Sequence, residues 1–113
     1  MNLSELLEGL KAVDPETWHD LILWDVNTKL PETSPISMYI IQGCIQQACE
    51  RRGWEIEQNY RIRGRDGNLP KNMRHYAVIT SWDKDVHTYR GMGNSATKAL
   101  LAAYIAAVKG EKK

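Results

Sequence analysis

A turn with two glycines, within YRGMGNSATKAL at residues 89–100, carries the side chains best suited to hold an anion. Gly91 and Gly93 would let a ligand approach the backbone closely, because glycine has no Cβ. The helix expected to follow presents free N–H groups and the positive end of its dipole. The candidate anion-binding residues are Arg90, Asn94, Ser95 and Thr97. The same segment also fits an ordinary strand-to-helix corner with a polar cap, and its spacing matches neither a P-loop nor a dinucleotide fingerprint.

Alternating arginines form a second candidate anion site in WEIEQNYRIR, residues 54–63. The alternation predicts a half-buried strand, with Arg61 and Arg63 on the same face as Glu55 and Glu57. The expected apolar face consists of Trp54, Ile56, Tyr60 and Ile62. Guanidinium groups bind phosphate through paired hydrogen bonds, so the arginines are candidate phosphate contacts. A solvated face on which they pair with the glutamates is the alternative.

Three aromatic residues near these arginines could stack on a ring of a ligand: Tyr76, Trp82 and Tyr89. Stacking on aromatic side chains is a common way to hold a base without reading its sequence. Such side chains also commonly fill a core. Both roles therefore stay open.

Groups suited to catalysis are sparse. His19, His75 and His87 are scattered, with no carboxylate at metal-ligand spacing, and neither GxSxG nor CxxC occurs. The sequence therefore predicts no catalytic residue, no metal and no cofactor. A small enzyme that uses His75 and His87, which fall on neighbouring expected strands, remains an alternative.

Length and charge indicate one domain with an uneven charge distribution. The chain has 113 residues and a net charge of +1, with seven acidic and two basic residues in 1–34 and thirteen basic and seven acidic residues in 35–113. A basic body is suited to an anionic partner, and a solvated surface whose charge asymmetry arises by chance is the alternative. The start lacks a signal-peptide pattern and no apolar run spans a membrane, which predicts a cytoplasmic protein. Cys44 and Cys49 fall on one expected helix, too far apart for a comfortable disulfide.

The hydrophobic pattern predicts the elements that must position these groups. Capping signals predict helices from Asn2, from Asp14 to about Asn27, and over 34–53. Strands are expected at 54–63, 74–82 and 86–90, followed by an alanine-rich helix at 95–110. The predicted fold is α+β, with a three-stranded antiparallel meander sheet packed with helices. Residues 1–113 form a single domain, in which an acidic helical extension (1–30) precedes an αβββα core (35–110). The alanine-rich helix also makes a homodimer an expectation.

The segment HYAVITSWDKDVHTYRGMGNSATKALLAAYIAA resembles the final strands, turn and helix of double-stranded RNA-binding domains. Gly91, Gly93, Ser95 and Ala99 match the pattern of that family. This resemblance implies binding of duplex RNA. The lysine cluster at the start of the family's last helix is absent here, where Lys98 is the one basic residue, so nucleic acid is an alternative rather than the favoured partner.

A second resemblance covers roughly residues 35–110. CERRGWEIE, VITSW and SATKALLAAYIAAVKG are similar to segments of small bacteriophage proteins of the ABA-sandwich type. This resemblance implies a phage or prophage accessory protein in the host cytoplasm, and it supplies no catalytic residues. The favoured interpretation is a non-enzymatic protein that acts by binding. It would either sequester an anionic, nucleotide-like ligand or block a host protein, in defence or regulation.

Overall fold

The computed structural model describes residues 2–23 and 35–111. The helices are α1 (Leu3–Val13), α2 (Pro15–Leu23), α3 (Pro35–Arg52) and α4 (Ala96–Glu111), and a 3₁₀ turn, η1, spans Lys71–Met73. The strands are β1 (Glu55–Tyr60), β2 (Arg63–Gly64), β3 (Gly67–Asn68), β4 (His75–Trp82) and β5 (Val86–Gly93). The predicted α+β class is confirmed. None of the described helices is long and apolar enough to cross a membrane.

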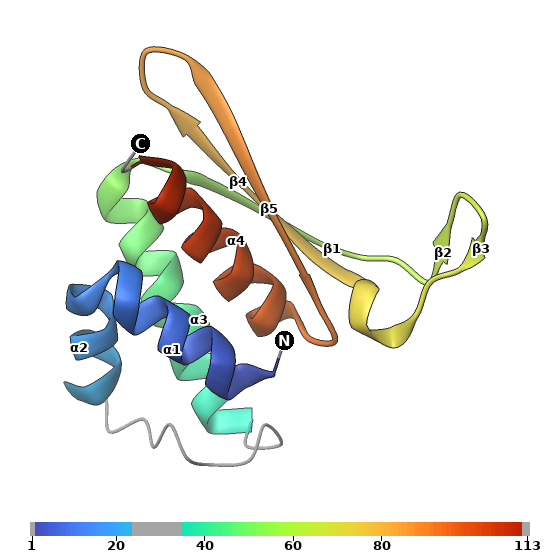
Figure 1. Cartoon of the computed structure of the whole chain (residues 1–113), viewed down its shortest axis with the longest axis horizontal. Coiled ribbons are helices and arrows are strands. Elements are labelled where there is room, and N and C mark those ends of the chain that lie inside the picture. The colour runs from blue at the N-terminus through green and yellow to red at the C-terminus, as the bar shows by residue number, and fades with distance from the viewer. Residues whose placement is uncertain (1, 24–34, 112–113) are drawn as a thin grey trace.

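The main sheet has the strand order β1–β4–β5, and both pairs are antiparallel. The helices α1–α4 lie on one side of this sheet, so its other face carries no helix from the described part of the chain (Figure 1). The alternation of each strand sends Ala77 and Ile79 of β4 into the core, whereas their neighbours Tyr76, Val78 and Thr80 are half-buried on the opposite side. We call this opposite side the helix-free face.

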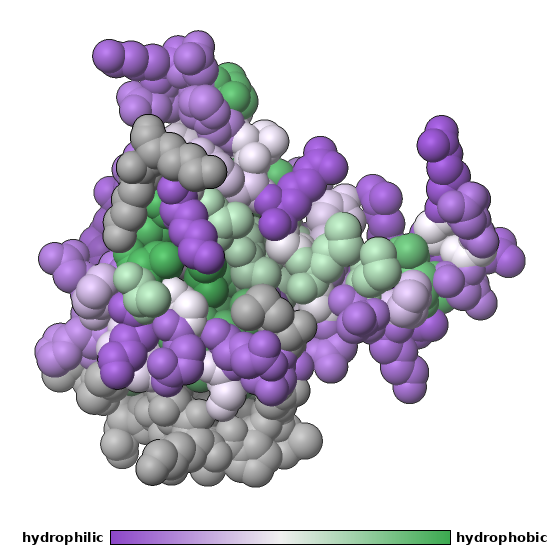
Figure 2. Space-filling model, in the orientation of Figure 1, coloured by the Kyte–Doolittle hydropathy of each residue, from purple (hydrophilic) through white to green (hydrophobic). Residues whose placement is uncertain are grey.

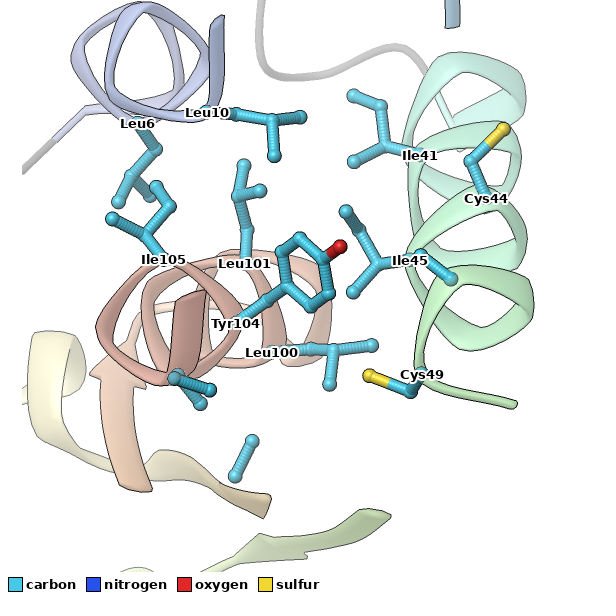
Figure 3. Packing of buried hydrophobic residues seen from close by; sticks show 14 of the residues in the cluster. Leu6, Leu10, Ile41, Cys44, Ile45, Cys49, Leu100, Leu101, Tyr104 and Ile105 are labelled. Carbon is cyan, nitrogen blue, oxygen red and sulfur yellow. The ribbon is translucent and has the colours of Figure 1, made fainter. Parts of the chain in front are cut away.

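The core is centred on α4, which packs between the sheet and the other helices. In Figure 3, Leu101, Tyr104 and Ile105 of α4 point toward side chains of α1 and α3. The buried leucines of α1 are Leu3, Leu6, Leu7 and Leu10. The N-terminal helices, which lie outside both sequence resemblances, therefore contribute directly to the core.

A second, two-stranded hairpin, β2–β3, lies where the sequence predicts a loop. Gly67 allows its turn, because its φ of 116° is a backbone conformation that favours glycine. The predicted apolar face of residues 54–63 is wrong at its end, since Tyr60 and Ile62 are 56% and 51% exposed. Strand β1 ends at Tyr60, and the chain then leads into the hairpin that projects away from the helices (Figure 1). The elements between β1 and β4 thus interrupt the predicted αβββα order.

Asp14 forms a buried polar cluster that joins three of the helices. Its carboxylate accepts hydrogen bonds from the Thr17 hydroxyl (2.6 Å) and from the Tyr104 hydroxyl of α4. Both hydroxyls donate to Asp14 Oδ2, and Nη2 of Arg52, at the end of α3, lies 3.6 Å from this oxygen. Arg52 also pairs with Glu111. Burial and the hydrogen bond to Asp14 raise the pKa of Tyr104 to about 12, so this hydroxyl remains a donor. The cluster fixes the α1–α2 junction onto α3 and α4.

Acid is expected to remove the contribution that the charge of Asp14 makes to stability. Burial alone would raise the pKa of Asp14, but hydrogen bonds from Thr17 and Tyr104, together with the Arg52 guanidinium, hold it below its ordinary value of 3.8. The stabilisation is therefore complete well above that value and is lost as the pH falls through the lower folded-state pKa. Urea unfolding of the wild type and of Asp14→Asn from about pH 7 down to about pH 2 measures this effect, since the loss is complete only below the folded-state pKa. The difference between the two unfolding free energies should shrink in acid, and a difference independent of pH would contradict the assignment.

Candidate functional site

The helix-free face is hollowed between the projecting end of the β4–β5 hairpin and the β2–β3 hairpin. Hydrophilic side chains gather on both projections (Figure 2). The hollow has a volume of about 520 Å³, within the usual range for sites that hold small organic ligands. The strand residues that line it are Glu57, Tyr76, Val78, Thr80, Thr88, Arg90 and Met92, and the segment between β1 and β4 adds Arg61, Gly64, Leu69 and Met73.

Arg61 is held against Tyr76 at one end of the hollow. Its Nη2 donates a hydrogen bond to the Tyr76 hydroxyl at 3.0 Å, and its guanidinium carbon lies 4.9 Å from the centre of the tyrosine ring. The backbone N–H of Arg61 donates to the carbonyl of Arg74 at 2.7 Å, which fixes the chain just beyond β1. Arg61 therefore presents a positioned cation, with further N–H donors, beside an aromatic ring.

Arg90 occupies the middle of the same face on β5. It lies opposite Val78 of β4, and Val78 lies opposite Glu57 of β1. The Arg90 side chain is exposed and makes no hydrogen bond or ion pair within the described part of the chain. Its guanidinium is thus free to bind an anion, and two cations distant in sequence line one hollow.

Glu57 adds a carboxylate to the hollow that the two arginines line. The Asn59 side-chain amide donates a hydrogen bond to Glu57 Oε1 at 3.0 Å, which orients the carboxylate. Because adjacent strands lie about 4.8 Å apart, the Cα atoms of Glu57 and Arg90 are roughly 10 Å apart. Val78 lies between them, and within residues 2–23 and 35–111 Glu57 and Arg90 form no ion pair with each other.

The side chains of the glycine-containing turn serve the fold on the other side of the sheet. The Ser95 hydroxyl accepts a hydrogen bond from the Lys98 N–H at 3.2 Å, which caps α4. Thr97 is buried, and its hydroxyl lies within hydrogen-bond distance of two acceptors of α3, the Met38 carbonyl (3.3 Å) and Gln42 Oε1 (3.2 Å). Asn94 is exposed at the turn itself. These residues are not brought together with the guanidinium of Arg90.

The two glycines of the turn allow close contact between β5 and α4. A Cβ at Gly91 would lie 2.3 Å from both the Ala99 carbonyl oxygen and the Ala103 nitrogen, and one at Gly93 would lie 2.9 Å from the Lys98 Cβ. Both glycines belong to β5, which extends past the predicted end at residue 90. The space beside Gly91 and Gly93 is therefore filled by the protein's own helix.

The remaining candidates do not line the hollow. Arg63 is exposed on β2, and Trp82 is 57% exposed at the far end of β4. Tyr89 is half-buried on the helix side, where a Cβ at Gly110 would lie 2.3 Å from its ring. Of the residues predicted from sequence, the structure brings together Arg61, Arg90 and Tyr76.

The expectation that neighbouring strands bring His75 and His87 close together is wrong. His75 lies opposite Gly93 and His87 lies opposite Ser81, so the two are at opposite ends of the β4–β5 pair. These two positions are six residues apart along β4, which is about 20 Å. Within residues 2–23 and 35–111, no three His, Cys, Asp or Glu side chains are grouped to hold a metal ion.

The thiols are placed as small core side chains. Cys44 and Cys49 are both buried and free. Burial raises the pKa of the Cys49 thiol to about 12, so this group is protonated at neutral pH. A protonated thiol is a poor nucleophile.

No family model matches the chain, and neither a curated protein nor a solved structure matches it. Sequence reasoning missed Thr80, Thr88 and Met92 as lining residues and treated Glu57 only as a partner for arginine. The signal that could have found them is the alternation of β4 and β5, since each of these residues shares its face with Tyr76 or Arg90.

Proposed function

We propose that the protein is a non-catalytic binding protein that holds an anionic, nucleotide-like ligand on the helix-free face of its sheet. The observation that carries this proposal is the convergence of Arg61, Arg90 and Tyr76 on one hollow of about 520 Å³. Two guanidinium groups supply charge-assisted hydrogen bonds to a phosphate, and Tyr76 supplies a ring surface.

The role that fits such a site is sequestration rather than conversion of the ligand. The resemblance to phage accessory proteins supports the further proposal that the ligand is a host signalling nucleotide withheld from defence or regulation in the host cytoplasm. The duplex RNA alternative draws less support, because Lys98, the basic residue at the start of α4, is buried.

Replacing Arg90 by glutamine is expected to weaken binding of a nucleoside monophosphate about tenfold, because a hydrogen bond to a charged group contributes about 1.5 kcal/mol. Arg61→Gln should have a similar effect, since it removes the second cation of the hollow. Isothermal titration calorimetry with GMP as the probe measures both.

Arg63→Gln is the matched control, since it removes the same charge from an exposed position outside the hollow. Its affinity should stay within about twofold of the wild type, because salt screens an exposed charge that does not line the hollow. An equal loss in all three variants would mean that only net charge attracts the probe. No loss in Arg61→Gln and Arg90→Gln would refute the site.

A second candidate function is contact with a host protein through the end of the β4–β5 hairpin. Trp82 and Val86 lie opposite each other there and are 57% and 58% exposed. Exposed tryptophan is a frequent anchor of protein interfaces. Placing a photo-crosslinking amino acid at Lys84 tests this candidate: a specific adduct that Trp82→Ala abolishes would support it, and the absence of a specific adduct in host extract would contradict it.

A further inference from the structure

We infer that the hollow, if it binds nucleotides as proposed above, prefers guanine nucleotides, with Glu57 binding the base edge and Arg90 binding the phosphate. The inference starts from the row Glu57–Val78–Arg90, which crosses all three strands of the sheet. A ligand that satisfies this row needs an anionic group at one end and hydrogen-bond donors at the other.

The row also provides space for a ring between the two charges. Val78 lies between Glu57 and Arg90, and Met92 borders it on β5, so the floor under a bound ring is apolar. The Cα atoms of Glu57 and Arg90 are about 10 Å apart, a separation that a base and its phosphate can span when both side chains extend into the hollow. A lone phosphate would engage Arg90 and leave the carboxylate unused.

The carboxylate determines which base fits. An ionised carboxylate accepts hydrogen bonds and donates none. Guanine presents two adjacent donors, its ring N1–H and its exocyclic amino group, which match the two oxygens of a carboxylate in parallel. Adenine and cytosine present an amino donor next to a ring-nitrogen acceptor, so one carboxylate oxygen would face a lone pair. Glu57 therefore favours guanine over the other amino-bearing bases.

Residues near Glu57 leave its carboxylate available for the base and add polar groups beside the ligand. Asn59 donates to Oε1, which leaves Oε2 and the second lone pair of Oε1 available for the base. Thr80 and Thr88 face each other in the adjacent row and place two hydroxyl groups beside the position expected for the ribose. The hollow thus offers an acceptor for the base, hydroxyl groups for the sugar, and Arg90 for the phosphate, with Arg61 as a second cation.

The test compares GMP with AMP by isothermal titration calorimetry on the full-length chain. The wild type should bind GMP at least about tenfold more tightly, because a site built for specific donors rejects a ligand that lacks them. Glu57→Gln should lose this preference or reverse it toward AMP, since a glutamine amide offers one donor and one acceptor, the pattern that adenine requires. Glu55→Gln is the control: Glu55 lies on the same strand and is also exposed, but it does not line the hollow, so the variant should keep the wild-type preference.

The outcomes separate this inference from the proposed function. Equal affinity of the wild type for GMP and AMP would overturn the guanine assignment while leaving nucleotide binding intact. A preference for GMP that survives in Glu57→Gln would overturn the role of Glu57. Binding of neither nucleotide would refute the proposed function, and the inference with it. Far-ultraviolet circular dichroism of each variant shows that the fold is retained.

Discussion

Replacing Gly91 by alanine is expected to lower the free energy of unfolding by about 3 kcal/mol or more, the upper part of the range for overpacking in a tight interior. The added methyl group would lie 2.3 Å from the carbonyl oxygen of Ala99 and from the nitrogen of Ala103. Both are backbone atoms of α4, so no side chain can rotate away and the helix must move off the sheet. Urea unfolding followed by circular dichroism measures the loss.

Gly43→Ala is the matched control for this prediction. Gly43 lies within α3, and a Cβ there would meet no atom within 4 Å. Alanine is a better helix former than glycine, so this variant should be as stable as the wild type or more stable by up to about 1 kcal/mol. If Gly91→Ala is as stable as Gly43→Ala, the close contact between β5 and α4 is absent in solution.

Replacing Asp14 by alanine is expected to cost about 3 kcal/mol, since it combines the loss of a helix cap with a buried hydroxyl left without its acceptor. Asp14 Oδ1 accepts from the Thr17 N–H at 3.3 Å at the start of α2, and Oδ2 accepts from the Tyr104 hydroxyl. The variant also leaves Arg52 without one of its two carboxylate partners. Chemical unfolding at neutral pH measures the change.

Asp20→Ala provides the comparison, because Asp20 also pairs with an arginine but does so in solvent. The Asp20–Arg51 ion pair spans 3.2 Å, with side chains 40% and 58% exposed. Such a surface pair contributes about 0–1 kcal/mol. A loss in Asp14→Ala no greater than that in Asp20→Ala would contradict the structural role of the buried cluster.

The parts of the fold that the sequence predicts well depend on local signals. Asn2 caps α1 by accepting from the Glu5 N–H at 2.9 Å, as the capping pattern indicates. The alternation of β4 and β5 and the alanine-rich α4 likewise lead to an α+β fold with an antiparallel sheet. These features require only the preferences of neighbouring residues along the chain.

The parts that the sequence does not predict depend on which residues meet across the sheet. Glu57 reads locally as a neutralising partner for arginine, and only the pairing of β1, β4 and β5 places it in one row with Val78 and Arg90. Likewise, two glycines before a helix are typical both of an anion site and of a close strand-to-helix contact. The distance from Gly91 to α4 favours the second interpretation.

The central claim, that the ligand lies on the helix-free face and not at the start of α4, is tested most directly by amide chemical-shift mapping while GMP is titrated into the labelled protein. We expect the largest amide shifts in the row Glu57–Val78–Arg90, in the rows on either side of it, and at Arg61. The amides of residues 94–97 should change little. Saturable shifts centred on Asn94, Ser95 and Thr97, with the sheet unaffected, would contradict the claim and would show that the ligand binds at the turn before α4.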